Sequence, residues 1–159
     1  MTLYEVLNGL DVQSGIPDVE ITSLTCDSRQ AEEDCLFFCT EGTRSDGHDF
    51  AAAALERGAA AVVCRKDLGL SRQILVPDTR EALGVCCNNF FGCPADKLTL
   101  MAVTGTNGKT TITYLIKHIL EKAGHRVGLI GTIHNEIDDV TLPARYTTPD
   151  PIQLYAIFA

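Results

Sequence analysis

Short apolar runs recur through the first 95 residues, and each is bounded by polar or glycine-containing segments. Residues 36–39 read Leu-Phe-Phe-Cys between two acidic segments, and residues 59–64 and 73–76 are similarly apolar. Such runs are typical of strands that are buried on both faces of a sheet. The pattern therefore predicts three buried strands.

Two segments beside these strands have the composition and the boundaries of helices. Residues 50–57 are rich in alanine and end before Gly58, a residue type that commonly follows a helix C-terminus. Asp78 or Thr79 is suited to cap the N-terminus of a second helix, which extends to about Phe91. Strands that alternate with helices predict an α/β fold for this part of the chain.

The pattern changes after residues 92–97, where glycine and proline interrupt both periodicities and predict a linker. Residues 98–103 are an apolar run that predicts a strand, and residues 126–131 predict another. Between them, residues 110–123 predict an amphipathic helix with one apolar face, made of Ile112, Leu115, Ile116, Ile119, Leu120 and Ala123. A strand–helix–strand order is typical of a parallel sheet with a right-handed crossover.

We therefore predict two α/β domains. Residues 1–95 form a small domain, and residues 96–159 form the start of a parallel-sheet domain, with a further helix opening at Pro149. A parallel nucleotide-binding sheet normally has about five or six strands, and residues 96–159 supply two or three. We expect the second domain to be incomplete in this chain, which we interpret as a fragment.

Composition excludes several classes of protein. The 159 residues are 45% hydrophobic with a formal net charge of -8, which argues against a general nucleic-acid or anionic-membrane surface. The chain lacks an apolar stretch near the roughly 20 residues that cross a bilayer, and its N-terminus lacks the pattern of a signal peptide. The seven cysteines contain no Cys-x-x-Cys pair, which favours buried thiols over a metal site or a disulfide scaffold. We expect a soluble cytoplasmic protein.

The segment between the predicted strand and helix of the second domain reads Gly-Thr-Asn-Gly-Lys-Thr-Thr. The general phosphate-loop pattern is G-x-x-x-x-G-K-[ST], and Val103 stands where its first glycine belongs. Two glycines nevertheless permit a backbone that turns N–H groups toward an anion, and the helix N-terminus adds positive potential. The segment predicts a loop that binds ATP phosphates through Gly105, Thr106, Asn107, Gly108, Lys109, Thr110 and Thr111.

Two residues of this loop are the candidate catalytic residues. Lys109 is expected to lie along the β- and γ-phosphates of ATP, and the Thr110 hydroxyl is expected to bind Mg²⁺. An ordinary glycine-rich turn is the alternative, but the apolar segment before the loop and the helix after it favour the phosphate site.

Several segments resemble the Mur ligase family, whose members build the peptide of bacterial cell-wall precursors. Residues 104–111 are similar to its ATP loop. The Asp27-Ser28-Arg29 turn, residues 36–50 and residues 58–63 resemble the N-terminal domain of the MurE and MurF types. The Thr147-Thr148-Pro149-Asp150 segment resembles the part of the MurE type that holds the peptide substrate. The resemblance covers nearly the whole chain in one order, which is more specific than any single motif.

The resemblance implies an ATP- and Mg²⁺-dependent amide ligase. In the MurE type, ATP phosphorylates the terminal carboxylate of UDP-MurNAc-L-Ala-D-Glu, and the amine of diaminopimelate or lysine attacks the acyl phosphate. The resemblance leaves the choice between these amino acids open. It implies substrate contacts at Ser28, Thr43, Arg44, Ser45, Thr147 and Thr148. We expect the full-length protein to be a monomer and the 159-residue chain to lack turnover by itself.

Other readings remain open. Ser28 could be a local turn cap, residues 43–45 a solvated loop, and Thr147 and Thr148 caps of the following helix. His48 is expected to pack or hydrogen-bond within its own loop, and Asp138-Asp139 to form a hairpin turn. The alternative functions are a MurF-type ligase that adds a dipeptide and a non-catalytic UDP-sugar-binding module. A generic P-loop GTPase or kinase would leave the N-terminal resemblance unexplained.

Overall fold

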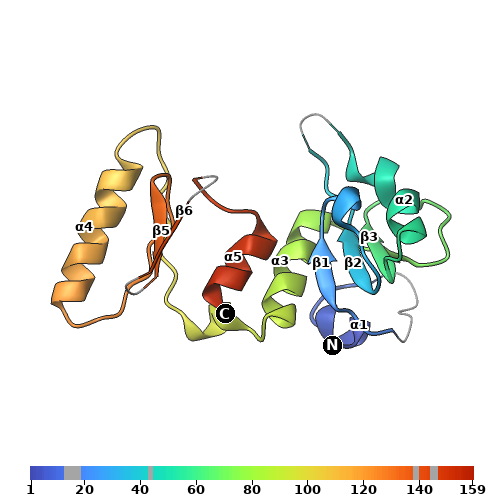
Figure 1. The fold of residues 1–159 in the computed structure, drawn as a ribbon, viewed down its shortest axis with the longest axis horizontal. Helices are drawn as coiled ribbons and strands as arrows, with labels where there is room; N and C mark the ends of the chain where they lie inside the picture. Colours follow the sequence, from blue (N-terminus) through green and yellow to red (C-terminus); the bar gives the residue numbers. More distant parts are fainter. Residues whose placement is uncertain (13–18, 43–44, 138–139, 144–146) are drawn as a thin grey trace. The chain divides into compact units, whose positions relative to one another are not determined.

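The computed structural model describes residues 1–12, 19–42, 45–137, 140–143 and 147–159 (Figure 1). These residues form two compact units. The first contains Met1–Lys97 and Tyr155–Ala159, and the second contains Leu98–Leu154. Within the described ranges, the helices are too short or too polar to cross a membrane.

A four-stranded parallel sheet is the centre of the first unit. Its strands follow chain order, and the register pairs Leu36 of the second strand with Leu24 on one side and Ala61 on the other. The strands are β1 (Ser23–Thr25), β2 (Cys35–Phe38), β3 (Ala61–Cys64) and β4 (Gln73–Leu75). The three strands predicted from apolar runs are confirmed, whereas β1 was not predicted.

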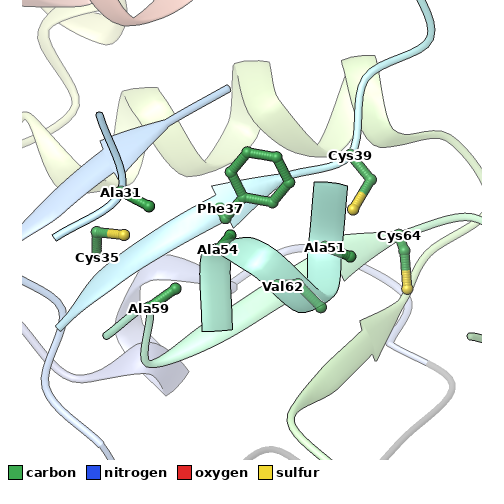
Figure 2. Close-up of a cluster of buried hydrophobic side chains, with 9 residues drawn as sticks. All are labelled: Ala31, Cys35, Phe37, Cys39, Ala51, Ala54, Ala59, Val62 and Cys64. Atoms are coloured by element: carbon green, nitrogen blue, oxygen red, sulfur yellow. The ribbon is translucent and has the colours of Figure 1, made fainter. Parts of the chain in front are cut away.

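Helices cover both faces of this sheet. In Figure 2, α2 (Ala51–Glu56) crosses in front of the strands and α3 (Thr79–Phe90) lies behind them. Alternate residues of a strand point to opposite faces, so Cys35, Phe37 and Cys39 join the cluster under α2. The rest of that buried cluster is Ala31, Ala51, Ala54, Ala59, Val62 and Cys64. This cluster packs α2 against one face of the sheet.

Short helices connect these elements. The first is α1 (Leu3–Val6), which the sequence pattern did not predict. A reciprocal capping box of Thr2 and Glu5 caps its N-terminus. The predicted cap of α3 is confirmed, because Asp78 Oδ1 accepts hydrogen bonds from the Arg80 and Glu81 N–H groups at 2.7 and 3.1 Å. The described residues of this unit also form the 3-10 helices η1 (Ser28–Gln30), η2 (Gly47–Phe50) and η3 (Pro94–Lys97).

The second unit contains one long helix and a hairpin. Helix α4 (Lys109–Lys122) confirms the predicted amphipathic helix. Strands β5 (His134–Ile137) and β6 (Val140–Pro143) pair antiparallel, in agreement with the predicted hairpin, although Asp138 and Asp139 themselves lie outside the described residues. Helix α5 (Pro151–Phe158) follows and spans the division between the units.

The strands predicted at 98–103 and 126–131 are wrong for this structure. Both segments lack helix and strand structure apart from a single bridge between Leu129 and Glu136. Leu100 and Met101 are 54% and 60% exposed. A strand needs hydrogen-bonding neighbours, and among the described residues of this unit only the Leu129–Glu136 bridge joins either segment to a strand. An apolar run therefore did not suffice to form the expected parallel sheet in this unit.

Candidate functional site

The carboxyl ends of the four parallel strands share one edge of the sheet in the first unit. Ligands of parallel α/β sheets generally bind at that edge, because the connecting segments there are exposed. Ser28 lies in the segment that follows β1, and Ser45 lies in the segment that follows β2, the neighbouring strand. The structure thus places two predicted substrate residues at the same edge. Thr43 and Arg44 lie outside the described residues.

Ser28 begins η1, but it is not the residue that caps it. Asp27 Oδ1 accepts the Arg29 N–H at 2.9 Å, and the Asp27 carboxylate also binds the Arg29 guanidinium at 2.7 Å. Arg29 thereby lowers the pKa of Asp27. The alternative role of Ser28 as a local turn cap is wrong, because Asp27 supplies the cap. The half-buried Ser28 hydroxyl remains a candidate substrate contact.

A network of charged residues surrounds the segment after β2, and the sequence motifs did not reveal it. Glu41 binds Arg65 at 2.7 Å, and Asp46 binds Lys66 at 2.8 Å. His48 is buried and bonds Asp46 at 2.5 Å, which confirms its predicted role within its own loop. The Asp46-Gly47-His48 triplet was the available signal, but its partners Arg65 and Lys66, which directly follow β3, are distant in the sequence.

The glycine loop of the second unit has the backbone that an anion site requires. Gly108 is the N-cap of α4 in the left-handed conformation, with φ of 79°, where a side chain would be strained. Because glycine has no side chain, it offers no cap to the first N–H groups of α4, which are then directed toward the loop. Lys109 is the first residue of α4, and its Nζ donates to the Gly105 carbonyl at 2.6 Å.

This loop fits the phosphates of a nucleotide. Lys109 holds its ammonium group beside the loop backbone, and Thr110 lies in the first turn of α4, whose N-terminus carries positive potential. The loop residues from Gly105 to Gly108 are exposed. A hydroxyl next to a lysine and several N–H groups matches the needs of a phosphate chain and its divalent cation.

The predicted peptide-binding segment precedes α5. Thr147 and Thr148 are exposed, and Thr132 Oγ1 donates to Thr147 Oγ1 at 3.3 Å. The alternative role of the threonines as helix caps is wrong, because Asp150 Oδ1 accepts the Gln153 N–H of the first turn at 3.0 Å. Their hydroxyls therefore remain candidates for substrate contacts.

A second polar network joins α4 to the hairpin. Glu136 on β5 binds Lys117 of α4 and its neighbour His134, and it accepts a hydrogen bond from Tyr114 at 3.4 Å. Lys117 and His134 together lower the pKa of Glu136 to about 2, and Glu136 raises the pKa of Lys117. The pKa of the acid is lowered and that of the base is raised, so each partner stabilises the charged form of the other.

The depressed pKa of Glu136 predicts a pH-dependent contact between α4 and the hairpin. The stabilisation of this contact by the Glu136 carboxylate is fully present above pH 4.5, the ordinary pKa of a glutamate. It is lost as the pH falls from there to about 2. Amide-exchange protection of α4 should therefore be higher in the wild type than in Glu136→Gln at pH 6. The two should converge near pH 2. Glu121→Gln is the control, since its contact with Lys117 is a longer 3.6 Å; a pH-independent difference for Glu136→Gln would contradict the prediction.

The fold and the loop together define a class: an α/β protein in which a small parallel-sheet unit precedes a glycine-rich loop and the helix that follows it. Two family models match the chain collinearly. The model of the Mur ligase family catalytic domain matches residues 20–91, and the model of the Mur ligase middle domain matches residues 103–159. The chain therefore belongs to the Mur ligase family.

Individual relatives match nearly the whole chain. A UDP-N-acetylmuramoyl-L-alanyl-D-glutamate–2,6-diaminopimelate ligase from Clostridium acetobutylicum is 47% identical over 89% of the chain, which covers 30% of that protein. The enzyme of the same name from Geobacillus thermodenitrificans is 44% identical over 99% of the chain, which covers 32% of it. The chain thus spans about a third of the length of these relatives.

Solved structures of two ligase types also superpose on the chain. A UDP-N-acetylmuramoyl-L-alanyl-D-glutamate–2,6-diaminopimelate ligase superposes with a TM-score of 0.75 and 28% identity over 99% of the chain, which covers 32% of that structure. MurF from Acinetobacter baumannii superposes with a TM-score of 0.54 and 30% identity over 82% of the chain, which covers 28% of it. The chain is more similar in structure to the diaminopimelate ligase than to this MurF.

Proposed function

We propose that this chain supplies the UDP-substrate-binding and ATP-loop parts of a ligase of the MurE type. The reaction would join 2,6-diaminopimelate to UDP-MurNAc-L-Ala-D-Glu, with ATP as the phosphoryl donor. The observation that carries the proposal is the collinear similarity to diaminopimelate ligases over 99% of the chain. The names of those relatives favour diaminopimelate over lysine, a choice that the sequence motifs left open.

The two units would bind different parts of the reactants. Residues 1–95 would bind the uridine nucleotide end of the substrate at the carboxyl edge of the sheet, with Ser28 and Ser45 as contacts. Residues 96–159 would contribute the ATP loop and, through Thr147 and Thr148, contacts to the muramoyl peptide. The support for this division is that Ser28 and Ser45 follow neighbouring parallel strands.

The chemistry requires activation of a carboxylate. A carboxylate is a poor electrophile until one oxygen becomes part of a phosphate leaving group, which ATP supplies. Lys109 would neutralise charge on the β- and γ-phosphates, and Thr110 would hold Mg²⁺. Backbone N–H groups of Gly105–Thr111 would bind the remaining phosphate oxygens. The geometry of the loop and the family to which the chain belongs support these roles.

We also place the reaction in the cytoplasm, with a protein that acts as a monomer on small molecules. Five of the seven cysteines are buried. Burial raises the pKa of Cys39 to about 12 and that of Cys64 to about 11, so these thiols are unreactive. A reducing compartment suits a protein with this cysteine content.

Replacement of Ser28 by alanine tests the substrate assignment. We expect the 159-residue chain to bind UDP-MurNAc-L-Ala-D-Glu, and Ser28→Ala to weaken that binding about fivefold, the effect of one lost hydrogen bond. Ser71→Ala removes an exposed hydroxyl that precedes β4 and so lies away from the carboxyl ends of the strands. It should leave the affinity unchanged. Calorimetric titration measures both. Equal affinities for Ser28→Ala and wild type would contradict the assignment, and a strong preference for UDP-MurNAc-tripeptide would favour the MurF type.

A further inference from the structure

We propose that Asp46, His48 and Lys66 are positioning residues for the nucleotide end of the substrate. Their contacts fix Asp46, the residue next to Ser45, and the inference rests on the proposed binding of UDP-MurNAc-L-Ala-D-Glu at this edge. The residues that carry the family resemblance include neither Arg65 nor Lys66, which directly follow β3.

His48 is the buried centre of this network. Its side chain is only 4% exposed, and both ring nitrogens are bonded. The Arg65 backbone N–H donates to Nε2 at 3.1 Å, so Nε2 is an acceptor and the ring proton lies on Nδ1. Nδ1 donates to Asp46 Oδ1 at 2.5 Å. A neutral His48 therefore ties the end of β3 to Asp46.

Asp46 receives three hydrogen bonds. Besides His48 Nδ1, the His48 backbone N–H donates to Oδ1 at 3.0 Å, and Lys66 Nζ donates to Oδ2 at 2.8 Å. Lys66 and the two His48 donors hold the pKa of Asp46 well below its usual range. The carboxylate is thus charged at neutral pH and has one preferred orientation.

Glu41 is held by the same two consecutive cations, Arg65 and Lys66. Lys66 also lies 3.4 Å from the Glu41 carboxylate, which Arg65 binds at 2.7 Å. Glu41 and Asp46 form an antiparallel bridge, and the Gly42 N–H donates to the Ser45 carbonyl at 3.0 Å. Lys66 is therefore the cation that both carboxylates share, and it keeps their two backbone positions together beside Ser45.

A metal site is the main alternative for this cluster. The ligand atoms of Glu41, Asp46 and His48 lie within 4.8 Å of one another. Two observations favour the hydrogen-bonded network instead. Both His48 nitrogens are already bonded, and Arg65 and Lys66 already neutralise the carboxylates. A divalent cation would have to displace these two side chains.

The effect of Lys66 should appear in binding rather than in stability. Lys66 is 50% exposed and Glu41 is 45% exposed, and ion pairs with this exposure contribute little to folding. Without Lys66, the Glu41 and Asp46 carboxylates repel each other, and Ser45, which adjoins Asp46, loses this support. A residue with a merely structural role would instead change the unfolding temperature together with the affinity.

The experiment compares Lys66→Met with wild type by calorimetry with UDP-MurNAc-L-Ala-D-Glu and by thermal unfolding. We expect about a tenfold loss of affinity, comparable to one charge-assisted hydrogen bond, with an almost unchanged unfolding temperature. Lys66→Arg should restore most of the affinity. Lys122→Met, which removes a charge at the far end of α4, should have no effect.

The outcomes separate the two proposals. Equal affinities of wild type and Lys66→Met would overturn the positioning role and leave the substrate assignment intact. Absence of binding by the wild-type chain would overturn both. Zn²⁺ binding by the wild type that His48→Gln abolishes would also overturn the network, since the cluster would then be a metal site.

Discussion

Replacement of Lys109 by methionine is expected to lower the affinity of the chain for Mg²⁺-ATP by about 100-fold. Methionine keeps an unbranched apolar side chain of similar length but removes the ammonium group beside the Gly105 carbonyl. Two charge-assisted hydrogen bonds to phosphate oxygens contribute roughly 1.5 kcal/mol each at the lower end of their range. Their joint loss corresponds to about two orders of magnitude in affinity, which calorimetry can measure.

Lys122→Met is the matched control for this loss. Lys122 is the last residue of α4, on which Lys109 is the first, so the control removes the same charge from the same helix. Its affinity for Mg²⁺-ATP should equal that of the wild type. Equal losses of affinity in both variants would show a general charge effect. An unchanged affinity in Lys109→Met would contradict the role of the loop in ATP binding.

Replacement of Gly47 by alanine should destabilise the first unit by about 3 kcal/mol, the upper part of the usual range for overpacking. A Cβ at this position would lie 2.7 Å from the Thr40 nitrogen and 2.8 Å from the Thr40 oxygen. Both atoms belong to the backbone, and the Gly47 N–H donates to that same oxygen at 3.0 Å. The strand end can therefore not move aside without breaking this bond. Urea denaturation measures the change in the free energy of unfolding.

Gly84→Ala is the control for Gly47→Ala, with the opposite expected sign. Gly84 lies inside α3, and a Cβ there meets no atom within 4 Å. Alanine should stabilise the helix by about 0.5–1 kcal/mol, because glycine loses more backbone entropy on folding. If Gly47→Ala were neutral, the close approach to Thr40 would not constrain the Asp46-Gly47-His48 triplet.

Local patterns predicted the parts of the fold that local forces decide. The apolar run of β2 and the Asp78 cap of α3 lie within a few consecutive residues, so each could be read directly. Strand β1 has only three residues and is defined by its pairing with β2, which no local pattern reports. The run at residues 98–103 failed for the converse reason, because its apolar residues found no strand partner in the described part of the second unit.

The same distinction applies to the candidate site. The glycine loop could be predicted because its residues are consecutive. The glycines, lysine and threonines on which the prediction depends all lie within Gly105–Thr111. The charged network was missed because it joins residues distant in sequence. The Arg65 N–H reaches His48 across 17 positions, and the Arg80 guanidinium reaches the Glu41 carbonyl across 39. Only the parallel sheet brings these strand ends to one edge.

We propose that one chain carries both a UDP-substrate site, at the carboxyl ends of its parallel strands, and an ATP loop. The most direct test is calorimetric titration of the 159-residue chain with UDP-MurNAc-L-Ala-D-Glu and, separately, with Mg²⁺-ATP. We predict saturable binding of each ligand, the first weakened by Ser28→Ala alone and the second by Lys109→Met alone. Binding of the UDP substrate without any binding of ATP would contradict this account and would identify a UDP-sugar-binding module instead.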